Sequence, residues 1–291
     1  MRAVALITCL FVLTMAAPVF AEQAQPSGAG ENGLKISLGY DGAYMHYSED
    51  QPFGAGVFDK ENGWMNGLSA EIRYDRAFSY PLFARVDFDY LDSNHVKYIG
   101  GLQTGNGTIV PYNATTPDVF YKTEFDFGYK VWNPGRFSLA PYLGVGYRDW
   151  VRGQDTLPDY RETYTWWYGA IGMEARCRAT KRLLAGVDAA LFLPFGQEMS
   201  TSISHTIDPA TFHIKSRPGW QVEVPISYDI YTTGAGRFAA FVFLTPYYER
   251  WDIGQSQTIT LTVNGQPVGA ALEPASHTDL YGAKAGIGVN F

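Results

Sequence analysis

The sequence is poor in cysteine, in formal charge and in long apolar runs. It has 2 Cys in 291 residues, and Cys9 lies within an N-terminal apolar segment. Cys177 is then the single cysteine of the remaining chain, which excludes an internal disulfide and a cysteine-based metal site. Charged residues make up 18% and the mean hydropathy is −0.14, a value too low for a bundle of apolar membrane helices. The net charge of −7 argues against a nucleic acid partner.

Motifs of the common cofactor and metal sites are missing as well. The sequence has no zinc-ligand spacing, no glycine-rich phosphate loop and no HExxH motif, so we expect no cofactor and no metal. Ser204 and His205 are adjacent, and adjacent side chains of an extended segment point to opposite faces. This spacing disfavours the His–Ser pair that an outer-membrane phospholipase or deacylase requires.

The first residues have the three-part pattern of a secretory signal peptide. Arg2 gives a positive start, residues 3–17 are apolar and uncharged, and Val19-Phe20-Ala21 places small residues before a cleavage site. The apolar run is shorter than the roughly 20 residues of a spanning helix. We expect a signal peptide over residues 1–21 and Sec-dependent export. A periplasmic N-terminal tail over residues 22–33 and one folded domain over residues 34–291 would follow.

Aromatic residues and glycine are abundant, and their arrangement predicts membrane-spanning strands. The chain has 20 Tyr, 18 Phe and 31 Gly. In Tyr281–Phe291 every second residue is apolar, with an aromatic residue at each end, and the residues between are small or polar. A period of two is that of a β-strand, and an apolar outer face with aromatic girdles is typical of outer-membrane barrels. The final Phe291 resembles the C-terminal membrane-insertion signal of such barrels.

Nine further segments alternate in a similar way, which predicts ten antiparallel strands. Short connections follow the even strands and long ones the odd strands, the pattern of periplasmic turns and outer loops. Asn264-Gly265 predicts a tight hairpin between Thr258–Val263 and the segment that starts at Gln266. We therefore predict an all-β fold, a closed antiparallel transmembrane β-barrel. The expected strands are residues 34–47, 64–74, 82–91, 119–131, 137–150, 162–177, 183–195, 220–231, 237–251 and 281–291, and the expected outer loops are 48–63, 93–118, 151–161, 196–219 and 252–278.

The predicted inner faces of the strands carry charges of both signs. A barrel of about ten strands is narrow, so these charges pair most simply with each other and make a rigid interior. The narrow bore disfavours a general porin, while a small selective channel stays open as an alternative. The predicted lumen charge network consists of Arg73, Arg85, Asp87, Asp89, Lys122, Glu124, Asp126, Arg148, Glu174, Arg176, Asp188, Glu223 and Lys284, with Lys35, Asp41, Glu71, Lys130 and Glu249 on the same faces.

Ten strands with five long loops resemble the omptins, a family of outer-membrane proteases, and adhesins of the OpcA type. The resemblance is one of architecture over the mature chain, and no specific motif carries it. It implies an Asp pair and an Asp–His pair across an extracellular cleft, where such groups activate a water molecule. Asp87 and Asp89 lie too close to the periplasmic turn for such a cleft. The remaining omptin-like candidates are Asp92, His95, His205, Asp208 and His213. The alternative interpretation is that they are solvated loop residues.

Trp166-Trp167 and Tyr247-Tyr248 are interpreted as interfacial girdle residues, with a carbohydrate-stacking platform as the alternative. We expect an integral protein of the cell outer membrane, non-enzymatic, with a structural or surface-interaction role through its long loops. A narrow selective channel and an omptin-like protease are the alternatives. Expected partners are outer-membrane lipid and lipopolysaccharide, and the barrel-assembly machinery and periplasmic chaperones during biogenesis. We expect a monomer that binds no nucleic acid.

Overall fold

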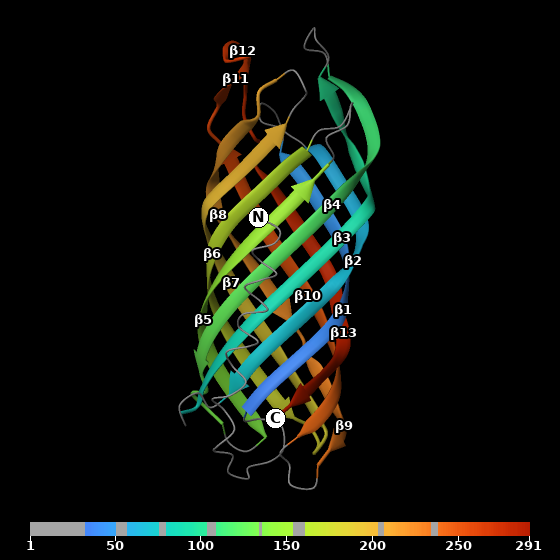
Figure 1. Ribbon diagram of the computed structural model, residues 1–291, viewed down its shortest axis with the longest axis vertical. Coiled ribbons are helices and arrows are strands. Elements are labelled where there is room, and N and C mark those ends of the chain that lie inside the picture. The colour runs from blue at the N-terminus through green and yellow to red at the C-terminus, as the bar shows by residue number, and fades with distance from the viewer. Residues whose placement is uncertain are drawn as a thin grey trace.

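The structure of the protein, a computed structural model, is a closed barrel of antiparallel strands that wind around one long axis (Figure 1). It describes residues 33–50, 57–75, 80–103, 109–133, 136–153, 161–202, 207–233 and 238–291. The predicted signal peptide, and the predicted tail apart from Gly33, lie outside the described residues. Within the described part of the chain, no helix is long and apolar enough to span a membrane.

The described residues form thirteen strands. Eleven of them make one sheet, and a separate hairpin makes the other. The strands are β1 (Gly33–Asp50), β2 (Val57–Asp75), β3 (Leu82–Gln103), β4 (Ile109–Tyr129), β5 (Phe137–Arg152), β6 (Arg161–Arg178), β7 (Leu183–Ser202), β8 (Ala210–Glu223), β9 (Ile226–Thr232), β10 (Ala239–Ser256), β11 (Ile259–Val263), β12 (Gln266–Ala271) and β13 (Ser276–Asn290).

The large sheet closes into a ring of ten positions. Each strand from β1 to β7 pairs with the next, β9 also pairs with β7, β8 and β9 both pair with β10, and β10 pairs with β13. The last pairing, β13 with β1, runs from Lys35 opposite Asn290 to Glu49 opposite Ser276 and leaves no open edge. Strands β8 and β9 share one position because Pro225, which lacks a backbone donor, interrupts the ladder between them. The predicted all-β antiparallel barrel is therefore confirmed.

Two aromatic belts on the outer surface bound the membrane-spanning part of the barrel. Many belt residues meet across neighbouring strands, as Tyr44 meets Trp64 and Tyr147 meets Trp167. On β5, Phe137 and Tyr147 are ten positions apart, which at a tilt of about 40° is roughly 25 Å along the barrel axis, the height of an apolar band. The upper belt consists of Tyr44, Trp64, Tyr90, Tyr121, Tyr147, Trp167, Phe195, Trp220, Tyr248 and Tyr281, and the lower belt of Tyr80, Tyr129, Trp132, Phe137, Tyr228, Tyr231, Phe238 and Phe291.

The final Phe291 belongs to the lower belt. Its backbone N–H donates to the carbonyl oxygen of Leu34 at 2.9 Å, and its ring packs edge-on against Phe238 at 5.6 Å between ring centres. The residue predicted as the insertion signal thus lies at the seam where the first and last strands meet.

Above the upper belt, the barrel continues as paired strands where the sequence predicted loops. The 22 residues of β3 span about 70 Å along the strand, far more than the apolar band requires. Pairing between β3 and β4 continues to Gln103 opposite Ile109, inside the predicted loop 93–118. The loop predictions for 48–63, 93–118 and 196–219 were therefore wrong over most of their length, and the prediction for 252–278 was wrong at its two ends, where β10 and β13 continue. Residues 154–160 of the predicted loop 151–161 lie outside the described residues.

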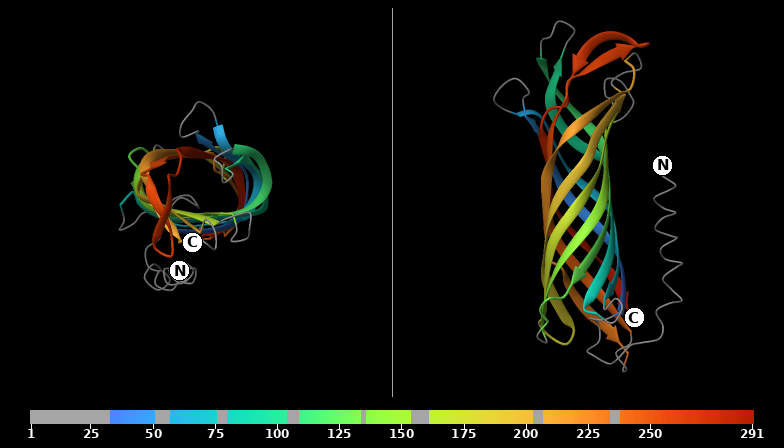
Figure 2. Two further views of the ribbon diagram at one scale, coloured as in Figure 1. Left: turned by 90° about the horizontal axis from the view of Figure 1, so that it is seen from above. Right: turned by 90° about the vertical axis from the view of Figure 1, so that its left-hand side faces the viewer.

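The predicted hairpin in the last long connection is confirmed. Strands β11 and β12 pair around Asn264 and Gly265, whose φ angles are 50° and 75°. Both values are positive, as a type I′ turn requires. The hairpin stands at the upper end of the barrel, beside the ends of the long strands (Figure 2).

Candidate functional site

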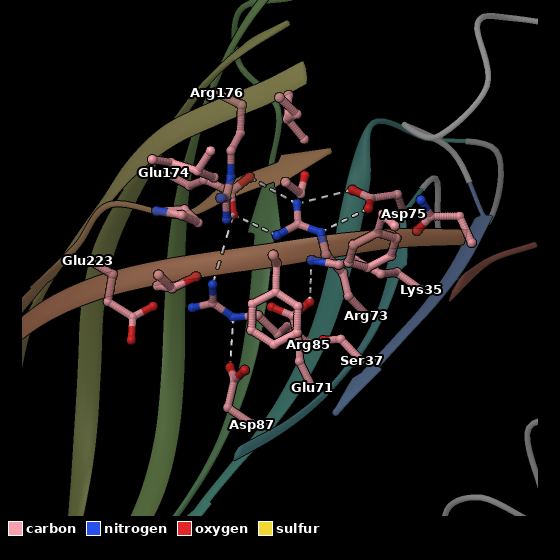
Figure 3. A pocket seen from close by; sticks show the side chains of 18 of the residues that line it. Lys35, Ser37, Glu71, Arg73, Asp75, Arg85, Asp87, Glu174, Arg176 and Glu223 are labelled. Carbon is pink, nitrogen blue, oxygen red and sulfur yellow. Dashed lines mark hydrogen bonds and ion pairs between the residues drawn. The ribbon is translucent and has the colours of Figure 1, made fainter. Parts of the chain in front are cut away.

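The lower half of the lumen is filled by ion pairs, several of which join strands that are not neighbours. Arg73 on β2 donates to both carboxylate oxygens of Glu174 on β6, at 2.6 and 3.0 Å. Arg85 on β3 reaches Asp126 at 2.7 Å and Asp188 at 2.7 Å. Bidentate and shared guanidinium contacts of this kind are strong because both partners are ionised. Figure 3 shows Arg73, Arg85 and Glu174 converging from different strands toward one level of the bore.

A second level of pairs lies nearer the upper belt. Lys284 on β13 contacts Asp89 at 2.9 Å and Glu223 at 3.2 Å, and Lys122 on β4 contacts Glu249 at 2.6 Å. Two cavities of about 130 and 30 Å³ lie among these levels, and the larger extends to the periplasmic rim at Gly33 and Asn290. The structure places all thirteen residues of the predicted charge network on the inner wall, together with the five residues on the same faces.

An aromatic layer closes the bore at the level of the upper belt. The guanidinium carbon of Arg148 lies 4.7 Å from the ring centre of Phe120, 5.2 Å from that of Trp166 and 5.0 Å from that of Trp251. Trp251 also stacks on Phe192 at 4.7 Å. All of these side chains are at most 4% exposed, and a water-filled path would leave solvent contact on at least one of them. The layer therefore blocks the bore above both cavities. We name it the aromatic plug, formed by Phe120, Arg148, Trp166, Tyr168, Phe192 and Trp251.

The aromatic plug corrects one prediction. Trp166 and Tyr247, expected in the interfacial girdle, point into the lumen, where the Tyr247 hydroxyl bonds to Asp41 at 3.0 Å. Their sequence neighbours Trp167 and Tyr248 lie on the outer wall, because adjacent residues of a strand face opposite sides. Each pair thus contributes one residue to the belt and one to the interior.

Above the aromatic plug lies a buried cluster of carboxylates around one guanidinium. Arg152 contacts Glu49 at 3.1 Å, Glu61 at 2.8 Å and Glu162 at 2.8 Å. Burial raises the pKa of Glu162 to about 7; Arg152 opposes the rise, and the neighbouring carboxylates Glu49 and Glu61 add to it. We call this set, with Glu273 bonded to the Tyr164 hydroxyl at 2.6 Å, the carboxylate cup.

Sequence reasoning missed the carboxylate cup because most of it comes from segments predicted as loops. Glu49, Glu61 and Glu273 fall inside the expected loops, and Arg152 is the second residue of the expected loop 151–161. The one usable indication was the density of glutamate near the predicted strand ends. It did not show which strands would continue upward and face inward.

The structure gives the omptin-like candidates separate places. Asp92 accepts from the Tyr90 hydroxyl at 2.7 Å, and His95 is exposed on the same strand. His213 is exposed on the outer wall, 3.2 Å from Glu198. Within the described part of the chain, no hydrogen bond or ion pair joins any two of these candidates. His205 lies outside the described residues.

Asp208 has a local structural role. Its carboxylate accepts from the Thr262 hydroxyl at 2.7 Å and from the backbone N–H groups of Asn264 and Gly265 at 3.2 and 2.9 Å. These bonds hold its pKa below the ordinary range. Asp208 therefore anchors the turn of the β11–β12 hairpin to the chain between β7 and β8.

Comparison with known families agrees with this architecture. Residues 7–188, more than half of the chain, match the family described as outer membrane protein beta-barrel domain. The chain therefore belongs to this family and is an integral β-barrel protein of the cell outer membrane. No curated protein sequence matches it.

Among solved structures, the chain is similar to the outer membrane protease OmpT of Escherichia coli, with a TM-score of 0.64 and 9% identity over 92% of this chain and 99% of that one. At this identity the likeness concerns the fold alone. The translocator domain of the autotransporter NalP of Neisseria meningitidis matches over 100% of this chain and 97% of that one, with 9% identity. Its TM-score of 0.39 is too low to support an argument.

Proposed function

We propose that the protein is a non-conducting outer-membrane barrel that acts by binding at the cell surface, through the part that stands above the upper aromatic belt. The observation that carries the proposal is the aromatic plug, in which buried rings surround Arg148. A barrel that is closed at this level presents a rigid outer wall and an extracellular end for contact with other molecules.

The filled lumen favours binding over conduction. A narrow selective channel needs a continuous polar path with binding that is weak enough to release the ion. Here the charged side chains in the lower half form ion pairs with each other, as Arg73 does with Glu174. The rings of Trp166 and Trp251 then present no polar path at the next level. Both features support a structural interior.

The placement of carboxylates and histidines disfavours hydrolysis. The carboxylate cup is buried, so Glu61 and Glu162 have almost no surface that a peptide could contact. The exposed His213 is paired with Glu198 on the outer wall, away from the lumen. General acid–base catalysis requires the catalytic group within hydrogen-bond reach of a bound substrate. The buried carboxylates do not allow that reach, and the exposed His213–Glu198 pair lines neither of the two cavities.

The β11–β12 hairpin is the best candidate for the binding element. Every residue of β12 from Gln266 to Ala270 is exposed, and Val268 presents 57% of its surface. On the β11 side, the backbone N–H of Asp208 already donates to the Thr262 carbonyl at 2.9 Å. The edge of β12 is left for an incoming extended segment, a common mode of peptide recognition.

Attachment of intact cells tests the proposal. Gram-negative cells that display the full chain are compared with cells in which residues 259–271 are replaced by a short Gly-Ser link, on surfaces coated with collagen, fibronectin or laminin. We expect full-chain cells to attach above the level of vector-only cells, and hairpin-deleted cells to fall to that level. A heat-dependent gel shift confirms that both barrels fold. Equal attachment by all three strains would contradict the proposal.

A further inference from the structure

Three potential metal ligands meet on the outer wall one row above the upper belt. His46 lies on β1 directly opposite Asp279 on β13, and His277 lies two residues from Asp279 on the same face. One ligand atom from each residue lies within 4.8 Å of the others. The Nε2 atom of His277 is 3.6 Å from Oδ2 of Asp279, too far for a good hydrogen bond. It is close to the roughly 3.3 Å that separates two ligand atoms around tetrahedral zinc.

The surrounding side chains orient these ligands. Nδ1 of His46 lies 2.5 Å from the Asn62 amide oxygen, so it carries the proton and leaves Nε2 free to ligate. Oδ1 of Asp279 accepts from the Tyr248 hydroxyl and from Arg250 at 3.3 Å, which leaves Oδ2 toward His277. Metal-binding histidines and carboxylates are commonly held by outer partners in this way.

The local charge also suits a cation. Arg250 is a positive group in contact with the site, and it is paired with both Asp252 at 2.9 Å and Asp279 at 3.3 Å. The two carboxylates outnumber the one guanidinium. Asp252 lies directly opposite His277 across β10 and β13. It is therefore close enough to complete the ligand set after a rotamer change.

We propose that His46, His277 and Asp279 bind a divalent transition-metal ion, Zn²⁺ in the first place, at the extracellular edge of the membrane. Two imidazoles and one carboxylate favour zinc over the oxygen-seeking Ca²⁺ and Mg²⁺. The fourth position is taken by water, or by Asp252 after its rotamer change. The ion links β1 to β13 above the belt, at the seam that closes the barrel.

Calorimetric titration of zinc chloride into untagged, refolded protein in detergent tests the site. We expect about one equivalent to bind with a Kd below roughly 0.1 mM. His46→Ala and His277→Ala are expected to weaken binding about 100-fold or more, and Asn62→Ala about 10- to 100-fold through loss of orientation. His213→Ala, a distant exposed histidine, is the matched control and should bind as the unmodified protein does.

Two outcomes overturn the proposal. One is the lack of saturable zinc binding by protein that shows the heat-dependent gel shift. The other is unchanged affinity in both His46→Gln and His277→Gln, which keep side-chain volume and fold. Titration with calcium chloride gives a further comparison, and calcium binding as tight as zinc binding would also contradict the assigned ligand chemistry.

Discussion

The guanidinium of Arg148 on β5 lies 5.0 Å from the ring centre of Trp251 on β10, across the bore of the barrel. Among the described residues, its terminal nitrogen atoms have no hydrogen-bond partner, and a carboxylate oxygen of Glu249 is 3.8 Å away. The faces of the aromatic rings, which attract a cation, stabilise the charge together with Glu249. The contact lies where the ion pairs of the lower lumen end and the aromatic packing above them begins.

Trp251→Ala is expected to lower the free energy of unfolding by about 3–5 kcal/mol, because it removes a fully buried ring that packs against Trp166 and Phe192 in the aromatic plug. The matched control is Trp64→Ala on the outer wall, where the side chain is 68% exposed. That change should cost less than about 1 kcal/mol in detergent. Urea unfolding followed by the gel shift measures both. Equal losses would show that the plug is not a packed core.

Glu174→Gln is expected to lower the free energy of unfolding by about 3–5 kcal/mol. The carboxylate forms ion pairs with Arg73 at 2.6 Å and Arg176 at 2.8 Å, and both guanidinium groups would stay buried without it. Glu198→Gln breaks an exposed pair with His213 and should cost less than about 1 kcal/mol. The same unfolding measurement compares the two. A Glu174→Gln protein as stable as the Glu198→Gln protein would contradict the assigned role of the lumen pairs.

Acidification is expected to stabilise the carboxylate cup, which lies above the membrane-spanning part. The pKa of Glu162 is raised by burial to about 7 from an ordinary 4.5, so the folded chain holds this proton more tightly than the unfolded chain. The resulting stability is fully present below about pH 4.5 and is lost as the pH rises through 7. Asp59, whose pKa burial raises to about 6, acts in the same direction.

The measurement is the difference in unfolding temperature between the unmodified protein and Glu162→Gln at pH 5 and pH 8. The glutamine side chain is neutral at every pH. The Glu162→Gln protein should therefore be more stable than the unmodified protein at pH 8, by on the order of 1 kcal/mol in free energy of unfolding, and the two should differ little at pH 5. Taking the difference between variants removes titration of other groups. A Glu162→Gln protein that is less stable at pH 8 would refute the prediction.

Asp208→Ala is expected to loosen the β11–β12 hairpin while the barrel stays intact. The change removes the acceptor for Thr262, Asn264 and Gly265. Amide hydrogen exchange should quicken over residues 259–271 and stay unchanged in β5 and β6. Asp252→Ala, on the outer wall, is the control for a lost acidic residue. Unchanged exchange in the hairpin would mean that Asp208 does not anchor it.

The sequence predicted the features that depend on local alternation. Leu38 faces outward and Asp41 inward as the period-two pattern indicates, and Asn264-Gly265 forms the expected turn. Alternation is strong there because lipid lies on one side and a polar lumen on the other. The fold class and the number of ring positions follow from the same pattern.

Contacts between distant strands could not be predicted in this way. Arg73 and Glu174 are 101 residues apart, and which charges share a level depends on the tilt and stagger of the closed barrel. On β10 the inner face carries Phe241, Tyr247 and Trp251, so both faces look apolar and the register is ambiguous from sequence. Above the belt, water surrounds the outer wall and alternation weakens, which made paired strands resemble loops.

Electrical recording from single barrels in a planar lipid bilayer tests the closed lumen most directly. The purified, refolded protein is added at a concentration at which a known porin gives clear steps. We predict no stepwise conductance, because the rings of Trp166 and Trp251 and the Arg148 side chain occupy the bore. Regular, voltage-stable steps from protein that shows the heat-dependent gel shift would contradict this account.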